Sequence, residues 1–540
     1  MLRKALTFII GFLVSCQISG YAVEFFGPLL NFLDTDGKKW NLSALVVAPQ
    51  SADSTNFTLS FEGSSETIAP ELIDTVKEQN FWRYDMSLVR EESEHKVTYK
   101  IGNKAYDIFV PAQHTDPHIF FGCCNEYAKP NSLWSRVNTV HEKTPYHVAF
   151  YAGDQIYNDP VFDLPSIKPV FSGTGKQILD FQPTPAIEDD VTTFLLKYYQ
   201  WHYSKPDFCS FAGSVPARNL SDDHEYFNGK GSYTQIPPIL ETVTKAADRF
   251  YFLFQHHTTK ENASRAKLIG PENTNSYSFL ATFENSAFYG LDTRSERTPT
   301  QIASPASRQF MFDRLNDLTQ PNIFVITGLP LVYQNLHLIE GGVRLFGYTD
   351  SAKAFMEAIN GSVPWFANLD MTTDFVDQWT HLNHVQERNE IIQNLDKLVS
   401  KGKTITLLGG DAHSAGAGEI VDLFSSVRMR QLTSSALTSS PTPAIAVKFK
   451  EFSRKLQNPE SFGNNLIQRL TSLKNMSSGN NEKSMDLNLN NWLDINLAKG
   501  GIYPVFFVVP NSQNPHSTAL ETWLPTGWTY PKGDTTFTVN

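Results

Sequence analysis

The sequence predicts an α/β fold in which sheets pack between helices, preceded by a smaller β-rich region. Four continuous apolar runs are typical of strands buried on both faces: residues 119–122, 147–153, 323–328 and 404–410. Three stretches with helical periodicity lie between these runs: residues 191–203, 307–318 and 383–400. Alternation of buried strands with helices indicates an α/β domain, which we expect over residues 116–540.

The β-rich region is expected over residues 23–115. Its strand-like runs are separated by Gly, Ser and Asn turns: residues 42–49, 57–61, 95–101 and 106–110. Several short strands of this kind indicate a small β-sandwich domain. Near the other end of the chain, residues 428–500 show little regular pattern and are predicted to be a loop or a helical insertion.

The first 22 residues resemble an export signal. Arg3 and Lys4 precede a short apolar run over residues 5–16, and Gly20-Tyr21-Ala22 offers a cleavage site. We therefore expect a secreted protein, periplasmic or extracellular. The alternative is a lipoprotein, because the residues before Cys16 resemble a lipobox and that cysteine would then carry a lipid anchor. No later run is long and apolar enough for a transmembrane segment in the mature chain.

Composition narrows the class of protein. Of the 540 residues, 41% are hydrophobic and 19% are charged, which indicates a globular chain. The formal net charge of −11 argues against a nucleic-acid surface. An acidic protein that binds an anionic substrate needs bound cations to reverse the local field.

Four short clusters carry residue types that bind metals. In order along the chain they are Cys124; Asp154 with Tyr157; Asp223 with His224; and Asp411 with His413. Three of the four follow predicted buried strands, where open α/β sheets place their ligands. Taken singly each has an ordinary interpretation, because Gly-Asp is common in turns and most tyrosines simply pack. Together they indicate a centre for two cations, which suits phosphate-ester chemistry.

The order of these clusters resembles the PhoD-like branch of the metallophosphoesterase superfamily, the alkaline phosphatase D family. The resemblance covers residues 120–416 and includes Gly-Asp-x-x-Tyr at 153–157, Asp-Asp-His-Glu at 222–225 and Gly-Asp-x-His at 410–413. It implies a four-layer αββα sandwich. It also implies a metallophosphatase, a hydrolase in which water held between two cations attacks phosphorus.

The resemblance assigns a role to each residue. Cys124, Asp154 and Tyr157 would hold Fe3+, and Asp223 and Asp411 would hold Ca2+, with His413 completing the metal ligands. Mn2+, Zn2+ and Mg2+ are the alternatives for these cofactors. Asp154 would bridge the two cations, and His224 would act on the leaving oxygen of the substrate.

Several assignments stay open from sequence alone. Arg294 and Arg297 either contact the phosphate or form an ion-pair network with Asp292 and Glu296, which we favour. Asp222 is expected to orient a neighbour rather than to bind metal. The alternatives to a phosphomonoesterase are a phosphodiesterase or phospholipase acting on lipid or cell-wall phosphates, and a surface-binding module with a silent hydrolase core.

Overall fold

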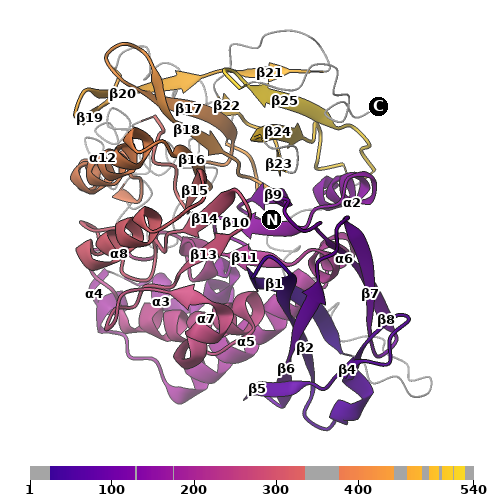
Figure 1. Ribbon diagram of the computed structural model, residues 1–540. Coiled ribbons are helices and arrows are strands. Elements are labelled where there is room, and N and C mark those ends of the chain that lie inside the picture. The colour runs from indigo at the N-terminus through magenta and orange to yellow at the C-terminus, as the bar shows by residue number, and fades with distance from the viewer. Residues whose placement is uncertain are drawn as a thin grey trace.

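The computed structural model describes residues 25–127, 131–173, 175–334, 376–442, 459–476, 486–497, 501–514 and 516–528. Two large sheets dominate the structure (Figure 1), and each contains a block of four neighbouring parallel strands. The predicted α/β class is therefore confirmed. The parallel blocks matter for function because all four strands of a block end at the same edge of their sheet.

The first large sheet has eleven strands in the order β21-β25-β24-β23-β9-β10-β11-β1-β2-β6-β5. Their bounds are β1 (Phe26–Thr35), β2 (Lys39–Pro49), β5 (Glu71–Val76), β6 (Gln79–Val89), β9 (His118–Gly122), β10 (Val148–Tyr151), β11 (Ala217–Asn219), β21 (Leu473–Asn475), β23 (Asn491–Asn496), β24 (Tyr503–Val508) and β25 (Glu521–Pro525). Strands β9, β10, β11 and β1 are parallel to one another, and the other neighbours are antiparallel.

The second large sheet has ten strands, nine of them in the order β12-β13-β14-β15-β16-β18-β17-β20-β19, with β22 paired to β17. Their bounds are β12 (Leu268–Ile269), β13 (Ser278–Thr282), β14 (Ser286–Gly290), β15 (Asn322–Thr327), β16 (Thr404–Gly409), β17 (Ala415–Val421), β18 (Val427–Thr433), β19 (Ser461–Gly463), β20 (Leu466–Thr471) and β22 (Asp486–Leu487). Strands β14, β15, β16 and β18 form its parallel block.

Helices cover the outer faces of both sheets. The α-helices are α2 (Leu133–Lys143), α3 (Lys168–Phe171), α4 (Gly175–Asp180), α5 (Pro185–Tyr203), α6 (Pro206–Ser214), α7 (Pro238–His256), α8 (Pro305–Asn316) and α12 (Val385–Ser400). Short 3-10 helices are η2 (Ser54–Phe57), η3 (Asp159–Asp163), η4 (Asp223–Glu225) and η5 (Lys260–Ala266). The three predicted helical stretches correspond to α5, α8 and α12. Helix α5 begins where the Thr184 hydroxyl accepts the N–H of Ile187.

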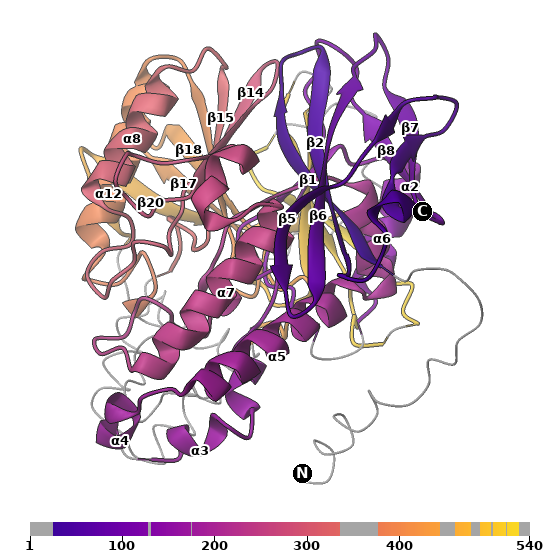
Figure 2. The ribbon, with the colours of Figure 1, turned by 90° about the horizontal axis from the view of Figure 1, so that it is seen from below.

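The two large sheets pack face to face. Phe150 on β10 stacks on Phe288 of β14 with ring centroids 4.6 Å apart, and Phe288 stacks on Phe324 of β15 at 4.2 Å. On β9, Phe121 lies in this central core while its neighbour Phe120 faces the helices, since successive side chains in a strand point to opposite faces. A second core lies under α2, α5, α6 and α7, and a third under α8 and α12. The layers are helices, sheet, sheet and helices (Figures 1 and 2).

The N-terminal region is β-rich, as predicted. Part of it forms a separate four-stranded sheet in the order β4-β3-β7-β8, with bounds β3 (Leu59–Phe61), β4 (Thr67–Ile68), β7 (His95–Ile101) and β8 (Lys104–Val110). The rest extends the first large sheet, because β1 pairs in parallel with β11 through Asn31 and Ala217. Hydrogen bonding therefore crosses the expected domain boundary near residue 115, and the division into domains stays a prediction.

The expectation for residues 428–500 is wrong for most of the part that the structure describes. Residues 434–442 are an irregular segment, but β18 continues to Thr433 and β19, β20, β21, β22 and β23 are strands, and the described part of this range contains no helix. Residues 443–458, 477–485 and 498–500 lie outside the described residues. So does the expected export signal over residues 1–22, including Cys16. Among the described residues, no helix has the length and apolar character that a membrane span requires.

Candidate metal centre and active site

The predicted site residues lie where parallel strands end. Cys124 follows β9, Asp154 and Tyr157 follow β10, and Asp223 follows β11. On the second sheet, Asp411 and His413 follow β16. Strands of the two parallel blocks therefore bring loops from both sheets to one place, and the structure draws all six predicted ligands together. Their role as metal ligands stays a prediction.

One side of the centre carries sulfur and phenol oxygen. The Cys124 sulfur lies 3.5 Å from Oδ2 of Asp154, and the Tyr157 hydroxyl lies 3.3 Å from the same oxygen. Nε2 of His413 lies 3.1 Å from the Tyr157 hydroxyl, so His413 belongs to this side of the centre. Three possible ligand atoms lie within 4.8 Å of one another here, one each from Cys123, Cys124 and Asp154.

The other side carries carboxylates. Asp154, Asp222, Asp223 and Asp411 each place one oxygen within 4.8 Å of the others. Asp154 is common to both sides, as a bridging residue must be. Oδ2 of Asp222 and Oδ1 of Asp223 are buried and have no hydrogen-bond partner. Buried acceptors without donors are costly, by about 1–3 kcal/mol each, and a cation at this point would satisfy them.

The titration behaviour of the carboxyl groups agrees with such a centre. Burial and the neighbouring Cys124 and Asp223 raise the pKa of Asp154 well above its usual value, and the same causes raise that of Asp411 to about 6. Like charges this close oppose ionisation unless cations lie among them. Burial alone would raise the pKa of the Cys124 thiol, but hydrogen bonding from Cys123 and the nearby His413 hold it well below its usual value. This donor set fits metal ions.

The backbone at the centre is strained in four places. Cys124, Asp154, Asp411 and His413 have φ angles of 62°, 54°, 53° and 50°, which is the left-handed region. Residues other than glycine rarely adopt this conformation, and it costs roughly 1–3 kcal/mol where the surroundings enforce it. Such strain clusters at functional sites. Here it turns four of the predicted ligands toward one another.

Glu225 ties two of the motif loops together. Its fully buried carboxylate accepts the backbone N–H groups of Asp154, Gln155 and Asp222 at 2.6–2.8 Å, and the side-chain amide of Gln255. Burial raises the pKa of Glu225 to about 7. The carboxylate thus sets the spacing between the loop that carries Asp154 and the loop that carries Asp222.

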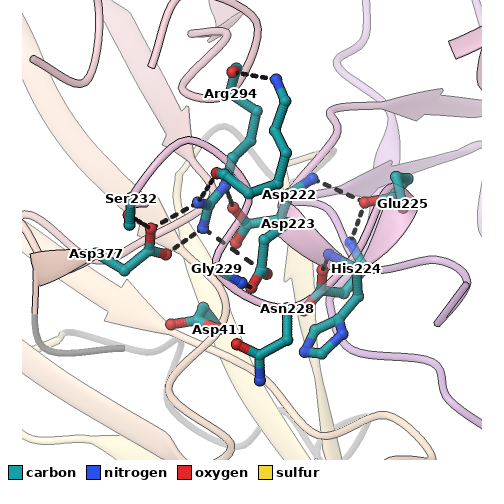
Figure 3. A network of polar contacts seen from close by, with 12 residues as sticks. Asp222, Asp223, His224, Glu225, Asn228, Gly229, Ser232, Arg294, Asp377 and Asp411 are labelled. Atoms are coloured by element: carbon teal, nitrogen blue, oxygen red, sulfur yellow. Dashed lines mark hydrogen bonds and ion pairs between the residues drawn. The ribbon is translucent and has the colours of Figure 1, made fainter. Parts of the chain in front are cut away.

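Arg294 lies behind the carboxylates (Figure 3). Its guanidinium pairs with Asp222 and with both oxygens of Asp377, and it lies 3.7 Å from Asp223. Arg297 also pairs with Asp377. The expected ion-pair network exists, but its partners are not Asp292 and Glu296, whose oxygens instead accept local backbone and serine groups.

Because the Arg294 side chain is fully buried and its donors are taken, it stabilises the carboxylates rather than meeting substrate. Asp222 was expected to orient a neighbour. It does hold Arg294, and its other oxygen remains in the carboxylate cluster.

His224 lies at the edge of the centre. Its backbone N–H donates to Oδ1 of Asp154, its ring stacks on Tyr157 with centroids 4.0 Å apart, and its Nδ1 is hydrogen-bonded to Oδ2 of Asp159. Burial would lower the pKa of His224, but Asp159 and Asp223 raise it well above the usual value. A protonated imidazole in this place can supply a proton to a leaving oxygen.

Other residues at the candidate centre were not assigned a role from the sequence. Ser435 donates its hydroxyl to the Cys124 sulfur at 3.1 Å, and Gln378 donates its amide to Asp411 at 3.2 Å. Oδ1 of Asn228 is buried near His224 and Asp411 without a partner (Figure 3). Asp159, which is bonded to His224, had a sequence signal because it closes the Gly-Asp-Gln-Ile-Tyr-Asn-Asp run, and Gln378 lies in an Asp-Gln-Trp run.

The adjacent histidines 256 and 257 are a further pair of side chains of a metal-binding type. Both side chains are buried, and Nδ1 of His257 lies 3.0 Å from the Ser43 hydroxyl. The ring of His256 packs against Tyr251 and Phe252. Neither histidine belongs to a group of metal-binding side chains in the described part of the chain.

Comparisons with known proteins agree with this geometry. A family model of PhoD-related phosphatases matches residues 126–363 and 347–485. The chain is 27% identical over 407 residues to an uncharacterized protein of Saccharomyces cerevisiae, an alignment that covers 64% of this chain and 57% of that protein. The chain thus spans little more than half the length of that relative.

A solved structure of PhoD shares the fold. It aligns with 96% of this chain and 95% of its own, at a TM-score of 0.56 and 12% sequence identity. At that identity the likeness concerns the fold alone. The family model, in contrast, matches well over half of the sequence, and its matched residues include Asp154, His224 and Asp411. The chain belongs to the family of PhoD-related phosphatases.

Proposed function

We propose that this protein is a metal-dependent phosphoesterase whose two cations share Asp154. The observation that carries the proposal is the placement of that one carboxylate between two chemically different ligand groups. Cys124 and Tyr157 offer a thiolate and a phenolate, which suit Fe3+. Asp223 and Asp411 offer hard oxygens, which suit Ca2+, with Mn2+ and Mg2+ as alternatives. Zn2+ is the alternative for the thiolate side.

When bound, the cations would lower the pKa of water and neutralise charge on the phosphoryl group. The residues around them have separate tasks. Glu225 and Arg294 fix the carboxylates, and Asp159 fixes His224. His224 then gives its proton to the departing oxygen. A poor leaving group can therefore depart as a neutral alcohol rather than as an alkoxide.

We also propose that the protein is exported, through the signal expected over residues 1–22 or through a lipid on Cys16. An exported enzyme of this class would meet phosphate esters outside the cytoplasm. Proteolytic mapping or mass spectrometry of the mature N-terminus tests this: a chain beginning after Ala22 supports secretion, and a diacylglycerol-modified Cys16 supports the anchor. A full-length chain that keeps Met1 in the cytoplasm contradicts both.

The direct test is metal analysis of the purified protein together with hydrolysis of p-nitrophenyl phosphate and bis(p-nitrophenyl) phosphate. We expect at least two cations per chain, one of them iron, and turnover of at least one substrate. Asp154→Asn should lose cations and activity together, whereas Asp317→Asn, an exposed change at the end of α8, should lose neither. A preference for the diester would identify a phosphodiesterase. Wild-type protein with its cations but no turnover of either ester would contradict the proposal.

A further inference from the structure

A serine-rich segment over residues 434–442 is hydrogen-bonded to the part of the centre that contains Cys124 and His413. It follows β18, which ends at Thr433. Backbone N–H groups of Leu437, Thr438 and Ser439 donate to the carbonyls of Cys123 and Cys124. The same segment holds His413, whose Nδ1 lies 2.7 Å from the Ser440 carbonyl oxygen. One short stretch thus fixes both a thiol and an imidazole of the proposed iron site.

Ser435 differs from its neighbours because it touches the sulfur itself. Its hydroxyl oxygen accepts the backbone N–H of His413 at 3.0 Å, which leaves the hydroxyl proton free to donate elsewhere. That proton points to the Cys124 sulfur, 3.1 Å away. The Ser435 side chain is fully buried, so water does not compete for this bond.

The Cys124 sulfur has a second neighbour that can donate. The Cys123 sulfur lies 3.2 Å from it and itself accepts the backbone N–H of Asp411 at 3.2 Å. Two donors therefore converge on one sulfur, from Ser435 on one chain segment and from Cys123 on another. Hydrogen bonds to a metal-bound sulfur draw electron density from it and thereby tune the bonded metal.

We propose that Ser435 is a positioning residue that tunes the Cys124 thiolate for its metal through the hydrogen bond from its hydroxyl to the sulfur. The inference rests on the proposed function in one respect, the assignment of Cys124 as a metal ligand. Without the bond the sulfur becomes a stronger electron donor. Charge transfer from sulfur to a bound metal then needs less energy, and reduction of a bound ferric ion becomes harder.

The structure offers a matched control in Ser439. Its hydroxyl also reaches Cys124 and is also fully buried, but it donates to the carbonyl oxygen of that residue at 3.0 Å. Ser439→Ala thus removes a buried serine hydroxyl from the same cysteine without touching the sulfur. If the serines act only as structural supports, Ser435→Ala and Ser439→Ala should have similar effects.

The experiment is the absorption spectrum of protein loaded with Co2+, whose sulfur-to-metal band reports the thiolate directly. We expect Ser435→Ala to shift this band to longer wavelength, and Ser439→Ala and Ser435→Thr to leave it in place. Ser435→Cys, which is similar in shape and a weaker donor, should give an intermediate shift and replaces the alanine variant if that variant does not fold.

Failure of the role proposed for Ser435 can be distinguished from failure of the proposed function. A wild-type band that Ser435→Ala and Ser435→Cys leave unmoved, or that Ser439→Ala moves equally, overturns the role of Ser435 and leaves the phosphoesterase proposal intact. A cobalt-loaded wild type with no sulfur band overturns the assignment of Cys124 as a ligand, and the inference with it. The iron-loaded protein gives an independent reading, because the reduction potential of Ser435→Ala should fall below that of the wild type and of Ser439→Ala.

Discussion

At the scale of single residues, two adjacent cysteines have different surroundings. Both are fully buried, but Cys124 faces Asp154 and receives hydrogen bonds, while Cys123 accepts the N–H of Asp411. Burial raises the pKa of Cys123 well above its usual value, which keeps it a neutral thiol. Of the two, Cys124 is therefore the better suited to bind metal as a thiolate.

Substitution by alanine should separate the two cysteines. Cys124→Ala should lose iron and activity, because a methyl group cannot replace a thiolate ligand. Cys123→Ala should keep its iron and most of its activity, with a loss of roughly 1–2 kcal/mol in the free energy of unfolding for the vacated space and the lost acceptor. Metal analysis and urea unfolding of both variants decide the matter. An active, iron-replete Cys124→Ala protein would refute the assignment.

His224 should matter most for substrates with poor leaving groups. If it protonates the leaving oxygen, His224→Ala should keep its cations and lose kcat by roughly 10²–10⁴-fold on alkyl phosphates. The loss should be much smaller on p-nitrophenyl phosphate, whose leaving group departs as an anion. Asp159→Asn, which removes the charge that faces Nδ1, should show the same pattern in weaker form. Equal losses on both substrates would instead indicate that His224 stabilises charge in the transition state.

The sequence pointed to the proposed ligands, whose metal-binding role stays a prediction, but not to every residue that supports them. Each ligand lies in a short motif, so its chemistry is readable from a few neighbouring letters. Ser435 has no motif, and it meets Cys124 only because distant segments fold together. Gln378 lies in an Asp-Gln-Trp run at 377–379, but nothing in that run indicates that its amide meets Asp411. The partners of Arg294 were mistaken for the same reason: Asp377 lies 83 positions away, whereas Asp292 and Glu296 are its neighbours in sequence.

At the scale of elements, the buried parallel strands were the most predictable. Strands covered on both faces need continuous apolar runs, and β9, β10, β15 and β16 have them. The short antiparallel strands after β18 were missed. In β20, for example, the exposed Arg469 stands among apolar residues, because that strand lies next to the end of its sheet and is only partly covered. A polar, short strand gives little periodicity to read.

The turn after β10 should tolerate no side chain at Gly153. Its φ angle is 109°, and a Cβ there would lie 2.5 Å from Cβ of Asp222 and 2.7 Å from the Asp222 backbone nitrogen. Gly153→Ala should therefore push apart the loops that carry Asp154 and Asp222, with loss of bound cations and of several kcal/mol of stability, roughly 2–4.

Gly402 provides the control for this prediction. Its φ angle is 90°, but nothing lies within 4 Å of an added Cβ. Gly402→Ala should show only the cost of the backbone conformation, roughly 1 kcal/mol, with normal cation content. Thermal unfolding and metal analysis of the pair separate the contact from the conformation. A Gly153→Ala protein that binds its cations normally would show that the two loops are not held in contact as described.

At the scale of the whole molecule, the site exists because two sheets end together. No single sheet carries the whole ligand set: Cys124, Asp154 and Asp223 follow strands of one, and Asp411 and His413 follow a strand of the other. The sequence predicted this only through the family resemblance, since nothing local specifies that Phe150 stacks on Phe288. The pairing of β23 with β9 is equally remote, because it joins residues near 494 to residues near 120.

Bringing carboxylates together from two sheets should destabilise the metal-free fold at neutral pH. The pKa of Asp411 rises from 3.8 to about 6 on folding, so the folded state holds its proton more tightly than the unfolded state does. The extra stability is present in full below the unfolded pKa and is lost as the pH rises toward 6. Relative to acid conditions, the ionised group then costs roughly 3 kcal/mol above that pH. Cations that bind only the folded state reverse the effect.

Asp411→Asn isolates this effect from all other titrating groups. With a chelator at pH 7.5, the variant should be more stable than the wild type by up to about 3 kcal/mol, because it lacks one repelling charge. At pH 4.5 that advantage should shrink, since the wild-type carboxyl is then largely protonated. With Ca2+ in excess at pH 7.5 the order should reverse, because only the wild type keeps its full ligand set. Urea unfolding under these three conditions measures the differences. If the variant is less stable than the wild type in chelator at pH 7.5, the repulsion among these carboxylates is not what the cations relieve.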